Sequence, residues 1–219
     1  MCLIPTCRLC DIVNTPVQNR KIQDRLLVQT TDFEWVPGLG AFVEGYSLVL
    51  SRQHVLNTGA FDHSVIRELA SLITQISEIL KQVYHTNVVV CEHGSMGSSA
   101  HAGSCVEHHH LHIFPVNLTH IPQILIDNFI KHRSVSSLED LVQMNREKVP
   151  YIYYSTGPGN HEVFEAPILP RQYMRQVLAA ELNLGYVWDW REYPFEENVA
   201  MFVLKVESLL DHKSSNSDA

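Results

Sequence analysis

The chain has 219 residues, of which 45% are hydrophobic and 18% are charged. This apolar content is enough for a folded core and excludes a disordered or collagen-like chain. The formal net charge of −8 is unlike that of a protein that binds nucleic acids irrespective of sequence, so we expect no nucleic-acid partner.

The first half of the chain predicts strands around one long helix. The N-terminal residues have no basic leader and no long apolar core, so we expect no secretory signal. Apolar residues recur at helical spacing from Val65 to Val83, which predicts an amphipathic helix with Asp62 at its N-cap. A loop rich in Gly, Ser and Ala covers 94–104. Strands are expected over residues 24–30, 41–43, 47–50, 87–91 and 106–115.

The second half predicts a mixed helical and strand region packed on the first. No window approaches about 18 uninterrupted apolar residues, so we expect no membrane partner. We assign residues 1–118 to one domain, 119–211 to a C-terminal extension packed on it, and 212–219 to a disordered polar tail. Helices are expected over 121–133, 136–145, 170–182 and 195–210, and strands over 151–154 and 161–166.

Four of the 13 histidines lie between His108 and His112. In a strand, His108, His110 and His112 share one face, because side chains two residues apart point the same way. Such a row packs poorly in a core, since each imidazole needs a polar partner. It could form a histidine-rich surface, a metal site, or a catalytic centre in which a neutral imidazole attacks phosphorus. The spacing of roughly 6.6–7 Å between neighbours disfavours one shared ion, so we favour catalysis.

Several motifs resemble those of the histidine-triad (HIT) family of nucleotide hydrolases and transferases. Residues 108–114 resemble the family signature His-φ-His-φ-His-φ-φ, where φ is apolar and His109 takes the first φ position. Residues 7–13 are similar to the opening Cys-x-x-Cys of zinc-bearing members, and residues 45–54 to the family's Gly-His-x-Leu-Val-Ile-Pro-Lys-x-His segment. The resemblance covers roughly residues 5–118. It implies an α+β fold, an antiparallel sheet with a long helix, here with an α/β C-terminal extension, and a homodimer.

The resemblance also implies catalytic roles for the three histidines. His110 would attack the α-phosphorus and form a nucleotidyl-imidazole intermediate, from which water releases a nucleoside monophosphate. His112 would contact the phosphate oxygens or the leaving group. His108 would hold the strand or bind metal.

Four further residues are expected to bind substrate. Ser104 lies where the family has a polar donor to the leaving oxygen, and Cys105 where a small donor lies; a small buried side chain is an equal alternative for Cys105. The triplet from Glu92 to Gly94 resembles a bacterial branch of the family, and His93 would reach the site from its strand end.

Two departures from the family pattern point to altered nucleoside recognition. Many members have His at the position of Tyr46, and a ribose-binding Asp at the position of Gly38. A non-standard nucleotide substrate, or a protein that binds nucleotides without turnover, is therefore an alternative.

The pair Cys7-x-x-Cys10 could be a redox pair, half of a zinc site, or chance. No thioredoxin-like β-α-β pattern surrounds it, and five cysteines without an export signal favour a cytoplasmic protein with free or metal-bound thiols. A tetrahedral zinc site needs two more ligands, which the resemblance implies are His54 and His108. The zinc would be structural, and magnesium is expected only as part of a substrate complex.

Two groups of residues in the extension could contribute to the site. Trp190 and its neighbours at 188–191 could stack on a base, but packing is the favoured interpretation. Arg171 and Arg175 could meet a polyphosphate, but a surface position is favoured.

The sequence thus predicts a cytoplasmic enzyme that cleaves or transfers a nucleotidyl group through His110. Candidate substrates are dinucleoside polyphosphates, nucleoside phosphoramidates and nucleotide-activated metabolites. A dinucleoside polyphosphate phosphorylase is the alternative within enzymes, and a non-catalytic nucleotide-binding protein is the alternative outside them.

Overall fold

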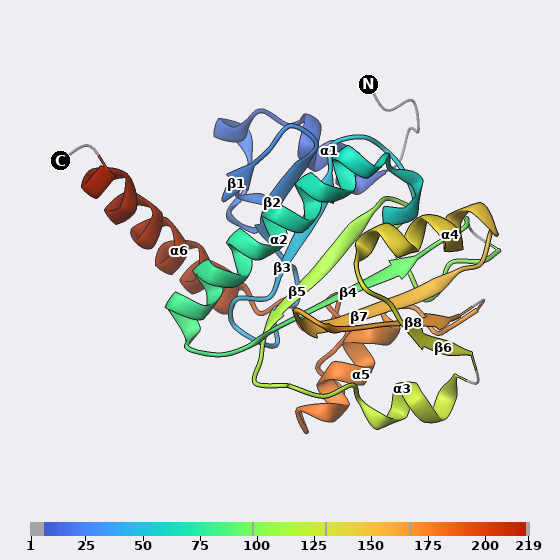
Figure 1. Cartoon of the computed structure of the whole chain (residues 1–219). Helices are drawn as coiled ribbons and strands as arrows, with labels where there is room; N and C mark the ends of the chain where they lie inside the picture. The colour runs from blue at the N-terminus through green and yellow to red at the C-terminus, as the bar shows by residue number, and fades with distance from the viewer. Residues whose placement is uncertain (1–6, 98, 130, 167, 218–219) are drawn as a thin grey trace.

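The computed structural model describes residues 7–97, 99–129, 131–166 and 168–217. In this part of the chain, one antiparallel sheet of eight strands, in the order β1-β2-β3-β5-β4-β7-β8-β6, forms the centre of the molecule (Figure 1). The strands are β1 (Val28–Gln29), β2 (Phe33–Pro37), β3 (Ser47–Ser51), β4 (Val88–Gly94), β5 (His110–Pro115), β6 (His132–Ser134), β7 (Tyr151–Gly157) and β8 (Asn160–Glu165).

Helices cover both faces of the sheet, α2 on one side and α3 and α5 on the other (Figure 1). The α-helices are α1 (Arg8–Asn14), α2 (His63–Tyr84), α3 (Gln123–Asn128), α4 (Leu141–Arg146), α5 (Tyr173–Glu181) and α6 (Glu196–Ser217). Short 3-10 helices lie at Val17–Asn19, Ile22–Asp24, Thr58–Ala60 and Leu138–Asp140. No helix in the described residues is both long and apolar enough to span a bilayer.

The long helix α2 confirms the sequence prediction. Its apolar stripe, which includes Leu69, Leu72 and Ile76, is buried against the sheet, as the 3.6-residue period requires. Asp62 holds the N-cap position with extended backbone, but its side chain makes no capping hydrogen bond.

Several element boundaries differ from the prediction. Residues 41–43 are not a strand, and the strand expected over 24–30 shrinks to β1, because the preceding residues form a 3-10 helix. Strand β2 was not predicted: all five of its residues are buried, so it lacks the alternation that marks a half-exposed strand. Strand β5 begins only at His110, and the edge strand β6 was also missed.

The C-terminal tail differs as well. Helix α6 continues to Ser217, although disorder was expected from residue 212. Adding residues to a helix that is already nucleated costs little, which accounts for the difference. Two predictions fall outside the described residues: the absence of a secretory signal in residues 1–6, and the end of the disordered tail at 218–219.

The extension joins the first half through the sheet. Strand β7 pairs with β4 from Val90↔Ser155 to Gly94↔Tyr151, and β8 and β6 follow at the same edge. A domain boundary near residue 118 stays a prediction, but the two halves share one hydrogen-bonded sheet.

Candidate functional site

A pocket of about 280 Å³ lies on the face of the sheet that carries His110 and His112. The first half, helix α1 and the extension all contribute to its walls. Besides the two histidines, its lining includes Arg8, Tyr46, His93, Cys105, Gln172, Arg175 and Trp190.

Strand pairing explains which side chains reach this pocket. His112 lies opposite Cys91 in the β4–β5 ladder, and Leu111 lies opposite Glu92. Paired residues of antiparallel strands share a face, and faces alternate along each strand. His93 therefore points to the same side as His110 and His112, whereas Glu92 points to the opposite side.

His110 is held as a neutral imidazole with one free nitrogen. Its Nδ1 lies 2.7 Å from the backbone oxygen of His108. A carbonyl oxygen only accepts hydrogen bonds, so Nδ1 carries the proton and Nε2 carries the lone pair. Burial lowers the pKa of His110, and the half-buried ring lines the pocket. This is the arrangement of a nucleophilic imidazole.

His112 lies beside His110, with 4.9 Å between the ring centroids. Its Nδ1 is 2.7 Å from the hydroxyl of Tyr46. Burial, followed by the neighbouring charges of His110, His93 and Arg175, lowers the pKa of His112 well below its ordinary value. The ring is therefore neutral at physiological pH.

His93 presents a buried acceptor to the same pocket. Its Nδ1 donates to the backbone oxygen of Ala102 at 2.6 Å, so its lone pair is on Nε2. That nitrogen is buried without a hydrogen-bond partner among the described residues. Burial lowers the pKa of His93 to about 4. His93 can accept a hydrogen bond from a hydroxyl or amino group of a ligand.

His108 departs from the expected row of three pocket histidines. Its Nδ1 is 3.4 Å from the Cys7 sulfur and 3.3 Å from the Cys10 sulfur, and it is not among the pocket-lining residues. His108 precedes β5, so the alternation of side chains along a strand does not apply to it. The His108 side chain thus lies with the two cysteines rather than in the pocket, while its backbone oxygen orients His110.

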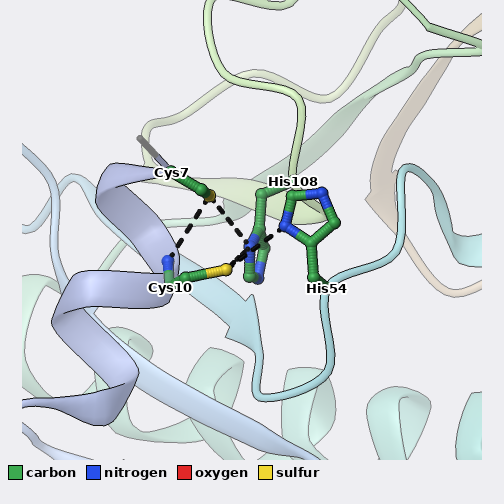
Figure 2. Close-up of side chains that lie close together, drawn as sticks. All are labelled: Cys7, Cys10, His54 and His108. Atoms are coloured by element: carbon green, nitrogen blue, oxygen red, sulfur yellow. Dashed lines mark hydrogen bonds between the residues drawn. The ribbon is translucent and has the colours of Figure 1, made fainter. Parts of the chain in front are cut away.

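Four side chains form a compact set of metal ligands (Figure 2). The ligand atoms of Cys7, Cys10, His54 and His108 all lie within 4.8 Å of one another, and Cys10 Sγ is 3.2 Å from His54 Nδ1. Zinc bonds of ordinary length place tetrahedral ligands about 3.3–3.8 Å apart, so the donor set and spacing fit zinc.

The surroundings of the cluster support the same conclusion. Cys7 is the N-cap of α1 and Cys10 lies in its first turn, which brings the two thiols to one side. The His108 Nε2 donates to the backbone oxygen of Ser51 at 2.7 Å. This bond fixes the proton on Nε2 and leaves Nδ1 for a metal, the usual outer-shell arrangement of a ligand histidine.

The remaining predicted substrate-binding residues separate into two groups. Cys105 is half-buried and lines the pocket. Ser104 is buried and donates to the backbone oxygen of Val106 at 2.8 Å, so its hydroxyl is already satisfied outside the pocket lining. Glu92 accepts hydrogen bonds from the Thr58 amide at 2.7 Å and the Tyr151 hydroxyl at 3.1 Å on the other face of the sheet. Neither Ser104 nor Glu92 is among the residues that line the pocket.

The two departures at positions 38 and 46 are coupled. A Cβ atom added at Gly38 would overlap the ring of Tyr46. The tyrosine ring therefore fills the space that any side chain at position 38 would need. Gly38 and Tyr46 thus belong to one local arrangement.

The extension contributes more to the site than its sequence predicted. Arg175 is only 2% exposed and lines the pocket, so the expected surface position is wrong. Trp190 also lines the pocket. Arg171 is exposed and donates to the backbone oxygens of Ser104 and Cys105. The sequence signal that was missed is a cation on the apolar side of an amphipathic helix, three residues before the buried Leu178.

Comparison with known proteins agrees with the fold and the motifs. Residues 19–118 match the family model described as the HIT domain. No curated protein matches the chain.

Similar solved structures include three from microbes. A hypothetical histidine triad nucleotide-binding protein from Sulfolobus tokodaii is 20% identical, with 65% of this chain and 93% of that one covered and a TM-score of 0.42. A zinc-bound histidine triad family protein from Mycobacterium smegmatis is 15% identical, with 65% and 91% covered and a TM-score of 0.40. A HIT family protein from Bacillus anthracis is 16% identical, with 52% and 76% covered and a TM-score of 0.44. The chain is therefore similar to the HIT domain over residues 19–118, and its α+β architecture accords with that match.

Proposed function

We propose that this protein is a nucleotide hydrolase or nucleotidyltransferase in which His110 is the nucleophile. The observation that carries the proposal is the fixed tautomer of His110. Its Nδ1–H is held by the His108 carbonyl, and its Nε2 lone pair belongs to a ring that lines the pocket. A nucleotide is the substrate class that fits a HIT domain.

The reaction would proceed in two steps. Nε2 of His110 attacks the α-phosphorus, the bond from phosphorus to the leaving oxygen or nitrogen breaks, and the leaving group departs with the bonding electrons and takes up a proton. The nucleotidyl-imidazolium keeps its Nδ1–H bonded to the His108 carbonyl, which stabilises the new positive charge. Water then attacks phosphorus, releases a nucleoside monophosphate and a proton, and restores His110.

The other pocket residues are proposed to hold the substrate. His112 contacts the phosphate oxygens or the leaving group, and Cys105 lies beside them. His93 accepts a hydrogen bond from a substrate hydroxyl or amino group. Dinucleoside polyphosphates, nucleoside phosphoramidates and nucleotide-activated metabolites all offer the required α-phosphorus, and magnesium would accompany a polyphosphate.

Zinc at Cys7, Cys10, His54 and His108 is proposed as a structural link. When bound, it supplies a cross-link rather than a reactive group. The link ties α1 to the segment just before β5, so it steadies the carbonyl that orients His110. We further propose that the protein is cytoplasmic and forms a homodimer. Sedimentation of the purified chain tests the oligomeric state.

The test is to trap a covalent adduct with diadenosine tetraphosphate labelled at the α-phosphorus. We expect a denaturing quench at alkaline pH, in which a phosphorus–nitrogen bond survives, to capture a labelled adduct in the wild type and none in His110→Ala. His161→Ala, a histidine on β8 outside the pocket, is the control and keeps the adduct. Turnover in a correctly folded His110→Ala variant would contradict the mechanism.

The same assay separates the alternative functions. Inorganic phosphate added to a phosphorylase yields a nucleoside diphosphate instead of a monophosphate. A non-catalytic binding protein retains the labelled nucleotide without forming an adduct, which would overturn the proposed chemistry.

A further inference from the structure

Arg175 is a buried cation inside the pocket wall, carried there by the extension. It lies in α5 and is 2% exposed. Its Nε donates to the backbone oxygen of Trp188 at 2.7 Å, and its Nη2 to the backbone oxygen of Gly40 at 2.6 Å. Two backbone carbonyls on different segments therefore hold the guanidinium in one position.

The guanidinium lies 4.9 Å from the ring centroids of both Phe42 and Tyr46. A cation over an aromatic face is attracted by the ring, more strongly when both are removed from water. Tyr46 in turn places its hydroxyl 2.7 Å from Nδ1 of His112, with the two rings nearly parallel at 10°. Arg175, Tyr46 and His112 form a row that leads from the extension to strand β5.

The hydrogen bond between Tyr46 and His112 has two proton arrangements. In the first, the tyrosine O–H donates to Nδ1, and the single N–H of the neutral imidazole is on Nε2. In the second, Nδ1–H donates to the tyrosine oxygen, and Nε2 carries the lone pair. The two arrangements present opposite groups to a ligand in the pocket.

We propose that Arg175, acting through Tyr46, fixes His112 as the Nε2–H tautomer and is thereby a positioning residue of this site. A positive charge beside the phenol favours the orientation in which the oxygen lone pairs face the cation and the O–H points away, toward His112. The same charge opposes an imidazolium at His112. The first effect selects the first arrangement, and the second keeps the imidazole neutral.

The consequence for the site rests on the proposed function. His110 would present a lone pair to phosphorus while its neighbour His112 presents an N–H to the phosphate oxygens. Negative charge grows on those oxygens during attack, so a donor held in place stabilises the transition state. The reversed tautomer would offer them a lone pair and repel them.

The chain contains a matched pair that serves as a control. The Tyr153 hydroxyl is 2.7 Å from Nδ1 of His161, and the two ring centroids are 6.0 Å apart. The Tyr46 and His112 centroids are also 6.0 Å apart. Tyr153 packs in the core on the α2 side of the sheet and does not line the pocket.

The first measurement is nitrogen NMR of the imidazoles in the full-length protein without ligand. We expect His112 to be protonated at Nε2 alone in the wild type. Tyr46→Phe removes only the hydroxyl and should populate the Nδ1–H tautomer, as should Arg175→Gln. Tyr153→Phe should leave the His112 signals unchanged. A wild-type His112 protonated at Nδ1 would overturn the proposal.

The second measurement is the rate of adduct formation from diadenosine tetraphosphate. We expect this rate to fall roughly 10- to 100-fold in Tyr46→Phe and Arg175→Gln, with partial recovery in Arg175→Lys, which keeps the charge. Tyr153→Phe should retain the wild-type rate. A changed tautomer with an unchanged rate would refute the positioning role. An inactive wild type with the expected tautomer would refute the proposed function alone.

Discussion

His109 stands at a position where the HIT signature has an apolar residue, and its environment explains how a histidine fits there. Its ring packs edge-on against Phe33 and Phe61. Its Nε2 lies 3.0 Å from the Thr58 hydroxyl and 4.0 Å from a Glu92 oxygen. Polar groups buried beside the ring thus satisfy its Nε2, whereas its buried Nδ1 has no hydrogen-bond partner among the described residues.

Glu92 makes the stability of this cluster dependent on pH. The carboxyl is 1% exposed, and burial raises its pKa from 4.5 to about 7 despite hydrogen bonds from Thr58 and Tyr151 that favour the charged form. The raised pKa means that the folded protein favours the protonated form of Glu92. This contribution to stability is fully present below the unfolded pKa of 4.5, and it is lost as pH rises through the folded pKa of about 7. Glu92→Gln does not titrate and avoids that loss.

We therefore expect the difference in unfolding free energy between Glu92→Gln and the wild type to shift in favour of the variant as pH rises from 5 to 9. This change in the free-energy difference can reach at most about 3 kcal/mol, the free energy that corresponds to the pKa shift of Glu92. Urea unfolding at each pH measures the difference. Glu78→Gln, on the exposed side of α2, is the control and should show a much smaller change. A pH-independent difference for Glu92→Gln would contradict a raised pKa.

At the residue scale, local spacing was enough to predict that His110 and His112 lie together. His110 and His112 share a face because strand geometry requires it, and both line the pocket. The same rule was wrong for His108, which precedes the strand. Arg175 could not be placed from sequence, because its burial depends on contacts with Gly40 and Tyr46, more than 100 residues away.

At the element scale, the ligand cluster joins three short segments. It brings together the first turn of α1, the segment after β3 that holds His54, and the residues just before β5. Helix α1 also packs Leu9 and Ile12 against Val36 and Leu50. With only seven residues in α1, this contact is small, so a metal bound at the cluster would be the larger constraint on the helix.

We expect purified, reduced protein to contain one zinc ion per chain and Cys10→Ser to lose it. The variant should be destabilised on the order of 3 kcal/mol, because a metal bound only by the folded chain stabilises that chain. Elemental analysis and thermal unfolding measure both effects. Cys105→Ser, outside the cluster, should keep the metal. Chelator-free wild type without zinc would contradict the assignment.

Elements were predictable where one face meets water and the other meets the core. Helix α2 is such a case, and its stripe was clear in the sequence. Strand β2 is buried on both faces, so its residues show no period of two. Short edge strands such as β6 are exposed throughout and carry no hydrophobic pattern at all.

At the scale of the whole molecule, the extension completes the site as well as the sheet. Strand β7 lies along β4, whose His93 faces the pocket, and α5 and the segment around Trp190 close one wall of that pocket. Pairing between strands about 60 residues apart depends on tertiary contacts rather than on local pattern. For this reason the sequence predicted that the extension packs on the first half, but not that its strands continue the same sheet.

This continuity leads us to expect one cooperative unfolding transition. The chain has three tryptophans, Trp35 in the first half and Trp188 and Trp190 in the extension. Trp35→Phe leaves tryptophan fluorescence only from the extension, and the double variant Trp188→Phe/Trp190→Phe leaves it only from the first half. In each variant, fluorescence and far-UV circular dichroism should give the same urea midpoint, because loss of β7 would expose β4 and both cores together. A fluorescence midpoint below the dichroism midpoint in Trp35→Phe would mean that the extension unfolds on its own, and the two halves would then be separate domains.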